Sequence, residues 1–401
     1  MSSAPRYDVQ TIRAAVPALQ EGAAHFDGPG GTQTPAVVAQ AVADTLLAAV
    51  SNRGTITPSE RRAEEIVAAC RAAIGDLVGT DPRGVVFGRS TTALVYDLSR
   101  ALATTWSAGD EVVVSRLDHD SNIRPWIQAA ERVGATVRWA DFDPDTGEQG
   151  LEHFAQVVTE RTRLVAVTGA SNLIGTIPPV REVADLAHGV GALLWVDGVH
   201  STAHLLPDRT AVGADFWACS PYKFLGPHCG TVSANPALLE SLRMDKLLPS
   251  TDEVPERFEL GTLPYELMAG VTAAVDFLAD LVPGDGDRRA RLTASYDALH
   301  EHEAALLARM EAGIAELPGA RLHSRAALRT PTLLFTLEGH DPQDVRHHLA
   351  QRQVNAPAGH FYALEASRRL GLGDAGGVRV GLAPYTDEQD VDRLLEGLGE
   401  L

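Results

Sequence analysis

The chain has 401 residues and a formal net charge of −19, from 34 basic and 53 acidic side chains. This balance disfavours nucleic acid and anionic membranes as partners, because both carry negative charge. The three cysteines lack the spacing of metal ligands and are too few for a disulfide framework, so we expect no metal site. The first ten residues do not resemble a signal peptide, and no apolar run approaches the ~20 residues that span a bilayer, which predicts a cytoplasmic protein.

Short apolar runs alternate with stretches of helical periodicity from about residue 36 to 280. Strands are predicted at 85–87, 111–114, 137–139, 164–167, 193–196, 216–218 and 230–232. Helices are predicted at 92–102, 123–133, 180–188 and 271–281. The alternation indicates an α/β fold with a mainly parallel sheet covered by helices on both faces. In such sheets, ligands bind beyond the carboxyl ends of the strands.

A cluster of turn residues at 283–287 indicates a domain boundary. Beyond it we predict a long amphipathic helix at 288–317, strands at 332–337 and 377–382, a helix opened by Asp341 and Pro342, and a last helix that begins with a capping box at Thr386. We therefore divide the chain into an N-terminal segment (1–35) that packs near the small domain, a large domain (36–282) and a small C-terminal α+β domain (283–401).

Two ionisable residues, Asp197 and Lys223, each follow an apolar strand. Pyridoxal phosphate (PLP) chemistry needs this pair, a lysine for the Schiff base and an acid that keeps the pyridinium nitrogen protonated. The apolar flanks of Lys223, which Ser220 and Tyr222 frame, indicate a buried amine with a lowered pKa. For Asp197, an ion pair with an arginine is the alternative interpretation.

Polar residues also follow the other predicted strands. The start of the helix after the first strand suits a phosphate, although its residues are also ordinary helix caps (Ser90, Thr91 and Thr92). His119 either stacks on a cofactor ring or lies in a polar surface loop. The amide of Asn172 either binds the ring hydroxyl of the cofactor or makes a turn. His200 lies one turn after Asp197 and can bind the phenolic oxygen or the phosphate.

Five motifs together resemble the class V aminotransferase family of fold-type I PLP enzymes, and within it the group-II cysteine desulfurases. They are Ser-Thr-Thr at 90–92, Asp-His-Asp-Ser-Asn-Ile-Arg-Pro-Trp at 118–126, Ser-Asn-Leu-Ile-Gly-Thr at 171–176, Val-Asp-Gly-Val-His at 196–200 and Ser-Pro-Tyr-Lys-Phe-Leu-Gly-Pro at 220–227. The resemblance extends from about Phe26 to the C-terminus. It implies a large PLP-binding domain, a small C-terminal domain and a homodimer with sites at the subunit interface.

The resemblance also implies roles for individual residues. Lys223 is the Schiff-base lysine, Asp197 the partner of the pyridinium and His119 the stacking histidine, while the phosphate end is lined by Thr91, Thr92, Ser220 and His200. Arg379 clamps the substrate carboxylate, a role that suits its fork of donors. Further residues are expected to bind substrate (Gly30, Arg53 and Asn122) or to reach the phosphate of the neighbouring subunit (Gly261 and Thr262).

The chain departs from the desulfurases at the loop that carries their nucleophilic cysteine, within Arg-Thr-Gly-His-His-Cys. Tyr362 occupies that position here, and no cysteine follows Cys229, which we expect to be buried. A persulfide on this loop is therefore not expected. We predict β-elimination from cysteine or an S-substituted cysteine in small-molecule biosynthesis, with His360 or Tyr362 either protonating the departing sulfur or only packing the loop. The alternatives are a desulfurase that uses an external thiol acceptor, and an epimerase or aminotransferase similar to isopenicillin N epimerase.

Overall fold

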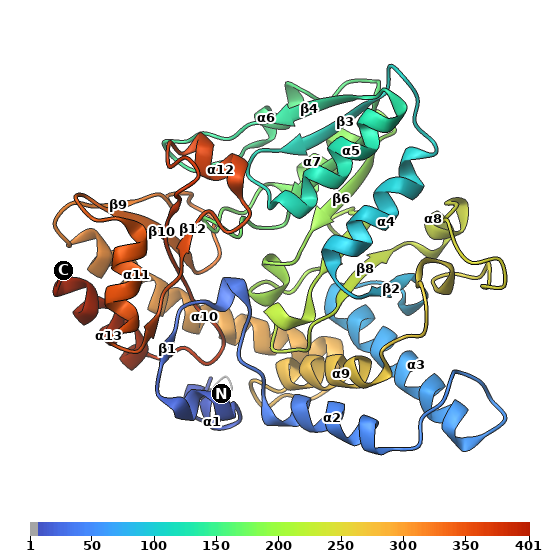
Figure 1. The fold of residues 1–401 in the computed structure, drawn as a ribbon, viewed down its shortest axis with the longest axis horizontal. Coiled ribbons are helices and arrows are strands. Elements are labelled where there is room, and N and C mark those ends of the chain that lie inside the picture. Colours follow the sequence, from blue (N-terminus) through green and yellow to red (C-terminus); the bar gives the residue numbers. More distant parts are fainter. Residues whose placement is uncertain (1–6) are drawn as a thin grey trace.

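The computed structural model describes residues 7–401, and its centre is a seven-stranded sheet in the order β2-β8-β7-β6-β5-β3-β4 (Figure 1). The strands are β2 (Val85–Gly88), β3 (Glu111–Ser115), β4 (Thr136–Ala140), β5 (Thr162–Thr168), β6 (Leu193–Asp197), β7 (Phe216–Cys219) and β8 (Gly230–Ala234). The neighbours from β7 to β4 pair in parallel, whereas β8 pairs antiparallel with both β2 and β7. The predicted α/β fold with a mainly parallel sheet is confirmed.

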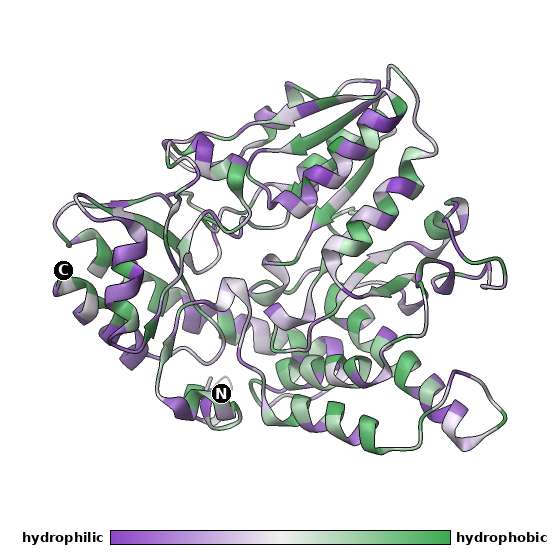
Figure 2. Ribbon diagram, viewed as in Figure 1, coloured by the Kyte–Doolittle hydropathy of each residue, from purple (hydrophilic) through white to green (hydrophobic). Residues whose placement is uncertain are grey.

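Helices cover both faces of this sheet because successive residues of its central strands are apolar and point to opposite sides. In β6, Trp195 packs in one core with α4 (Thr91–Ala103) and α5 (Arg124–Val133). Its neighbours Leu194 and Val196 pack in the other core with α3 (Pro58–Val78), α7 (Val180–Gly189) and α9 (Tyr265–Ala279). Figure 2 shows α9 mostly green, as expected for a helix with apolar neighbours. Shorter or peripheral helices are α1 (Val9–Ala14), α2 (Ala36–Leu47), α6 (Leu151–Ala155) and α8 (Pro236–Ser241).

A second, antiparallel sheet of four strands follows later in the chain, in the order β12-β13-β10-β9. Its strands are β9 (Ala320–Leu322), β10 (Thr332–Leu337), β12 (Ala358–Gly359) and β13 (Gly377–Gly381). The helices of this part are α10 (Arg288–Ala315), α11 (Pro342–Ala350), α12 (Leu364–Arg369) and α13 (Glu388–Gly399). The short β1 (Ala24–His25) pairs in parallel with β11 (Val354–Asn355), so the N-terminal segment contacts this part of the chain. The boundaries at 35 and 282 stay predictions.

One helix begins at another cap than expected, and one helix was not expected at all. The last helix is capped by Asp387, which exchanges hydrogen bonds with Asp390, while the hydroxyl of Thr386 accepts from the N–H of Ala383. α3 was not predicted, although its start carries a clear signal in the sequence: Thr57 and Glu60 form a capping box around a proline at the first helical position. Within residues 7–401, no helix combines the length and the apolar character that crossing a membrane requires.

Candidate active site

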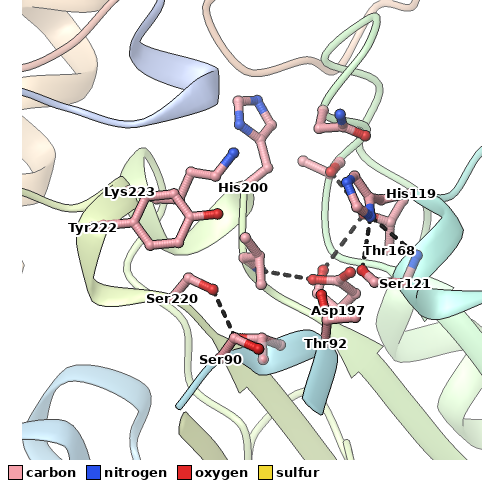
Figure 3. A pocket seen from close by; sticks show the side chains of 14 residues that line it. Ser90, Thr92, His119, Ser121, Thr168, Asp197, His200, Ser220, Tyr222 and Lys223 are labelled. Carbon is pink, nitrogen blue, oxygen red and sulfur yellow. Dashed lines mark hydrogen bonds between the residues drawn. The ribbon is translucent and has the colours of Figure 1, made fainter. Parts of the chain in front are cut away.

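The carboxyl ends of five strands meet at one edge of the central sheet, and a cavity opens there. We call it the inner cavity. It is lined by Ser90, Thr91, Thr92, His119, Ser121, Thr168, Ala170, Asn172, Asp197, Val199, His200, Ser220, Tyr222 and Lys223. In Figure 3, Lys223 and Tyr222 lie on one side of it, and His119 and Ser121 lie on the other. Parallel strands therefore bring together side chains that are more than 130 residues apart in the sequence.

Lys223 follows β7 in a short 3-10 helix, and only 8% of the residue is exposed. Its Nζ donates to the carbonyl oxygen of Pro29 and lies 5.6 Å from the centre of the Tyr222 ring. Burial lowers the pKa of Lys223 to about 7, the charge of Arg379 adds to this, and Asp197 opposes it. Near neutral pH, much of this lysine is therefore a free amine, the form that condenses with an aldehyde.

Asp197 ends β6 and is 6% exposed, and its Oδ1 accepts from the backbone N–H of Val199 at 3.0 Å. Burial raises the pKa of this carboxyl to about 6, while the Val199 hydrogen bond and the charge of Lys223 lower it. Among residues 7–401 it forms no ion pair, so the alternative of an arginine partner does not hold. A buried carboxylate in this position gains from a cationic ligand group.

His119 caps the short 3-10 helix η4 (Asp120–Asn122) after β3. Its Nδ1 accepts from the backbone N–H of Ser121 at 3.1 Å, which places the proton of the neutral ring on Nε2. Burial, and then the charges of Lys223 and Arg379, lower the pKa of His119 to about 3. The ring is therefore neutral and has the flat, uncharged face that stacking on an aromatic ligand requires.

The start of α4 forms one end of the inner cavity. Ser90 caps the helix by accepting from the N–H of Ala93, and the hydroxyl of Thr91 donates to the carbonyl of Cys219 at 2.8 Å and lies 2.6 Å from the hydroxyl of Ser220. The helix start can approach β8 this closely because residue 230 is glycine, where a Cβ would overlap with the backbone of residues 90–91. The first N–H groups of a helix of 13 residues, together with hydroxyls, form a suitable site for a phosphate.

Two buried polar atoms of the inner cavity have no hydrogen-bond partner within residues 7–401, Oδ1 of Asn172 and Nδ1 of His200. The other amide atom of Asn172 donates to the carbonyl of Phe361 at 3.0 Å, and Nε2 of His200 lies 2.9 Å from the hydroxyl of Thr330. Buried polar groups are normally paired, so these atoms indicate that a polar ligand belongs in the cavity. A ring that carries a hydroxyl, a basic nitrogen and a phosphate fits these atoms, Asp197 and the start of α4.

Arg379, on β13, is 2% exposed and faces a wider space of about 1210 Å³, the outer chamber, which adjoins the inner cavity. The chamber is lined by Pro29, Gly30, Thr92, Tyr96, His119, Asp120, Ser121, Arg124, Pro125, Asn172, Tyr222, Lys223, Phe361, Tyr362 and Arg379. The Nη1 of Arg379 donates to the carbonyl of Asn172 at 2.8 Å, and its Nε has no partner in the described part of the chain. Burial lowers its pKa to about 9, which still leaves a cation. A buried guanidinium without an acidic ion-pair partner is suited to a carboxylate ligand.

The structure does not bring every expected residue to the chamber. Asn122 lies outside both spaces: its amide donates to Asp118 at 2.5 Å and accepts from the indole of Trp126 at 3.2 Å, so its expected role stays a prediction. Arg53 also lies outside the chamber, where its guanidinium binds Glu64 and Glu256, and its expected role stays a prediction. His360 lines a neighbouring depression instead, and its Nδ1 accepts from the N–H of Tyr362. Gly261 and Thr262 lie exposed in a surface segment.

Several lining residues were missed, and most of them had a signal in the sequence. Ser121 and Thr168 follow the same strand ends as the predicted residues. Tyr96 lies one helical turn after Thr92, on the same face of α4. Phe361 is the neighbour of two predicted residues in the loop after β12, and nothing in the local sequence indicates that its ring contacts Arg379.

None of the three cysteines lines either space within the described residues, and all three are buried. Burial raises the pKa of both Cys219 and Cys229 to about 12. The hydroxyl of Thr231 lies 2.9 Å from the sulfur of Cys219. Thiols with such raised pKa values stay protonated at neutral pH.

Comparison with known proteins identifies the family. The family description "Aminotransferase class-V" matches residues 24–394. The chain belongs to this family. Over nearly its whole length it is 33% identical to an uncharacterised protein of Mycobacterium tuberculosis, MT3887 (98% of this chain and 99% of the relative). It is 30% identical to a cysteine desulfurase of Dickeya dadantii (98% and 96%).

Solved structures share the fold of this class V aminotransferase family member. The cysteine desulfurase CsdA of Escherichia coli superposes with a TM-score of 0.86 at 24% identity, over 98% of each chain. A mutant of C-DES, with glycine covalently linked to its PLP cofactor, superposes with a TM-score of 0.82 at 19% identity, over 97% of this chain and 99% of that one. The chain is thus a PLP-dependent enzyme of the cysteine desulfurase-like type with the fold-type I architecture, as its motifs predicted.

Proposed function

We propose that this enzyme cleaves the C–S bond of cysteine or an S-substituted cysteine by β-elimination in small-molecule biosynthesis. The substrate and one water molecule give a thiol (hydrogen sulfide from cysteine itself), pyruvate and ammonia. One observation carries the proposal. A buried lysine and a buried arginine without an acidic partner, Lys223 and Arg379, line the same chamber, into which no thiol of the described chain opens. The lysine and arginine suit an amino-acid substrate, and the lack of a thiol disfavours persulfide formation on the protein.

The inner cavity would hold PLP through groups that already lie in place. Asp197 would pair with the ring nitrogen, Oδ1 of Asn172 and Nδ1 of His200 are available for oxygens of the ligand, and the start of α4 with Ser220 would bind the phosphate. The neutral ring of His119 would stack on the ligand. PLP bound here supplies an electron sink for the negative charge that develops at Cα.

Lys223 is the group that moves the proton. Its lowered pKa of about 7 means that the free amine is well populated at neutral pH and can accept the proton from Cα. Arg379 holds the carboxylate with two donors and thereby fixes which bond of Cα faces Lys223. At the outer end, the phenol of Tyr362 lines the chamber and is 71% exposed, so it can donate a proton to a departing sulfur. His360 lies farther out and would act only through Tyr362.

We also infer a homodimer with shared sites. Leu248 and Leu260 lie in the same segment as Gly261 and Thr262, and they are 98% and 58% exposed. Exposed leucines in this segment are compatible with a surface that a second copy of the chain covers. Light scattering of the purified protein tests the oligomeric state, and mixing a Lys223→Ala chain with a Thr262→Ala chain tests whether the sites are shared. A cytoplasmic location remains a prediction.

The reaction is tested with PLP-loaded protein and S-methyl-L-cysteine, by assaying pyruvate and methanethiol together. Equal amounts of both products, absent from the Lys223→Ala variant, are expected. Alanine from cysteine in the presence of an added thiol would indicate a desulfurase with an external acceptor. Loss of optical purity without pyruvate would indicate an epimerase. Either result would replace the proposed elimination.

A further inference from the structure

The loop between β12 and α12 has an unusual backbone at the edge of the outer chamber. Phe361 and Tyr362 are consecutive, and both have positive φ angles, of 50° and 58°. For residues with a bulky side chain this region is strained, and it persists only where the surroundings hold it. The contacts of this loop therefore show which residues stabilise its strained backbone and which site residues it contacts.

Phe361 contacts two groups of the site at once. The guanidinium carbon of Arg379 lies 3.7 Å from the centre of the Phe361 ring, and the carbonyl of Phe361 accepts from the amide of Asn172 at 3.0 Å. The next carbonyl, of Tyr362, accepts from the N–H of Asp120 at 2.7 Å. The loop is thus bound on one side to Asn172 and Asp120 of the large sheet's loops and on the other side to Arg379 of the second sheet.

The ring of Phe361 fixes the plane of the Arg379 guanidinium. No acidic residue within 7–401 forms an ion pair with Arg379, and its only side-chain hydrogen bond runs from Nη1 to the carbonyl of Asn172. One hydrogen bond to Nη1 does not by itself specify the plane of the guanidinium. The aromatic face specifies this plane, because a guanidinium stacks flat on a ring and prefers its electron-rich face.

We propose that Phe361 is a positioning residue that orients Arg379 for the substrate carboxylate, and thereby makes the site select amines that carry an α-carboxylate. The inference rests on the proposed role of Arg379. Phe361 also contacts the apolar cluster that contains Leu117, Phe142 and Leu370, so a role in packing alone is the alternative. Packing alone would affect every ligand equally, whereas orientation of Arg379 affects only ligands with a carboxylate.

The test uses PLP-loaded protein and two probes, L-alanine and ethylamine, whose binding is followed by the change in cofactor absorbance. Phe361→Leu keeps a branched side chain and the backbone hydrogen bond but removes the aromatic face. It is expected to weaken L-alanine roughly tenfold, the size of a desolvated cation–π contact, and to leave ethylamine within about twofold. Phe361→Tyr keeps the face and should bind both probes as the wild type does. Leu372→Ala, in the same apolar cluster, is the matched control for loosened packing.

Three other outcomes of the binding experiment would contradict the proposal, each for a different reason. If Phe361→Leu weakens both probes equally, or weakens neither, while the wild type prefers L-alanine, Phe361 does not position Arg379. If Leu372→Ala loses the preference as strongly as Phe361→Leu, packing is the cause. If the wild type itself shows no preference for L-alanine, the proposed clamp fails, and the inference fails with it.

Discussion

Replacing Lys223 with methionine in the PLP-free protein tests the electrostatics of the site without any catalytic assay. Methionine has a similar length but no charge, so the variant removes the buried amine and preserves most of the packing. Burial is the main reason that the pKa of Lys223 lies near 7 in the folded protein, compared with an ordinary value of 10.5. The variant therefore lacks a group whose proton binding differs strongly between the folded and unfolded chain.

The sign and size of the effect follow from proton linkage. Between pH 7 and the ordinary lysine pKa, the unfolded chain holds the proton that the folded chain releases, so the free energy of unfolding rises with pH. The full difference between the two pKa values corresponds to about 5 kcal/mol. Between about pH 7 and about pH 9, the wild type should gain about 2 kcal/mol of stability that Lys223→Met does not gain. The carbonyl of Pro29 loses its donor in the variant, but this cost does not depend on pH.

The assay is urea unfolding of both PLP-free proteins at several pH values, because the difference between the two cancels the titration of the groups that do not interact with Lys223. Lys246→Met is the matched control, since the chain has only two lysines and the ammonium of Lys246 binds Asp252 and the carbonyl of Ser250 outside the chamber. A difference between wild type and Lys223→Met that stays constant with pH would show that the amine is hydrated, and the argument for a free amine at neutral pH would fail.

Three further predictions concern the ring nitrogen, the leaving group and the fold. Asp197→Asn should retain PLP but lower kcat at least about a hundredfold, because an amide cannot supply the negative charge; spectra and steady-state kinetics check this. Tyr362→Phe should slow the loss of weakly acidic thiols more than acidic ones, as measured by kcat/KM over a series of S-substituted cysteines. Gly84→Ala should lower the free energy of unfolding by at least about 2 kcal/mol in a urea titration, since its Cβ would overlap with the carbonyl oxygen of Ala234.

The core of the site could be predicted from the sequence because it depends on strand ends. Asp197 and Lys223 each directly follow an apolar strand, and parallel strands end at the same edge of a sheet. The alternation of strands and helices is therefore enough to predict that Asp197 and Lys223 lie close together. Arg379 was predicted only through the family motif, since nothing local indicates that β13 brings its side chain to the same chamber.

The expected residues that lie outside the chamber and the missed residue have a common physical cause. Asn122 lies in the right motif, but its side chain points to Asp118 and Trp126, and a motif does not specify which way a side chain faces. Arg53 binds Glu256, which lies about two hundred residues away in the sequence, so its partner was not visible. The role of Phe361 depends on a positive φ angle and on a ring contact with another strand, and neither leaves a local signal.

The fate of the sulfur links the loop to the reaction. At the loop position where the desulfurases carry their cysteine, this chain presents a phenol whose ring centre lies 5.5 Å from that of His119. A phenol donates a proton but does not accept sulfur as a persulfide, and the buried thiols of Cys219 and Cys229 have pKa values near 12. In the proposed elimination, sulfur that leaves Cβ in this chamber would therefore have no covalent acceptor on the described part of the chain, and it would pass to the solvent or to a second small molecule. With unsubstituted L-cysteine as the substrate, the released sulfide should accordingly pass quantitatively through a filter that retains the protein, whereas sulfur retained with the protein as a persulfide would refute this reasoning.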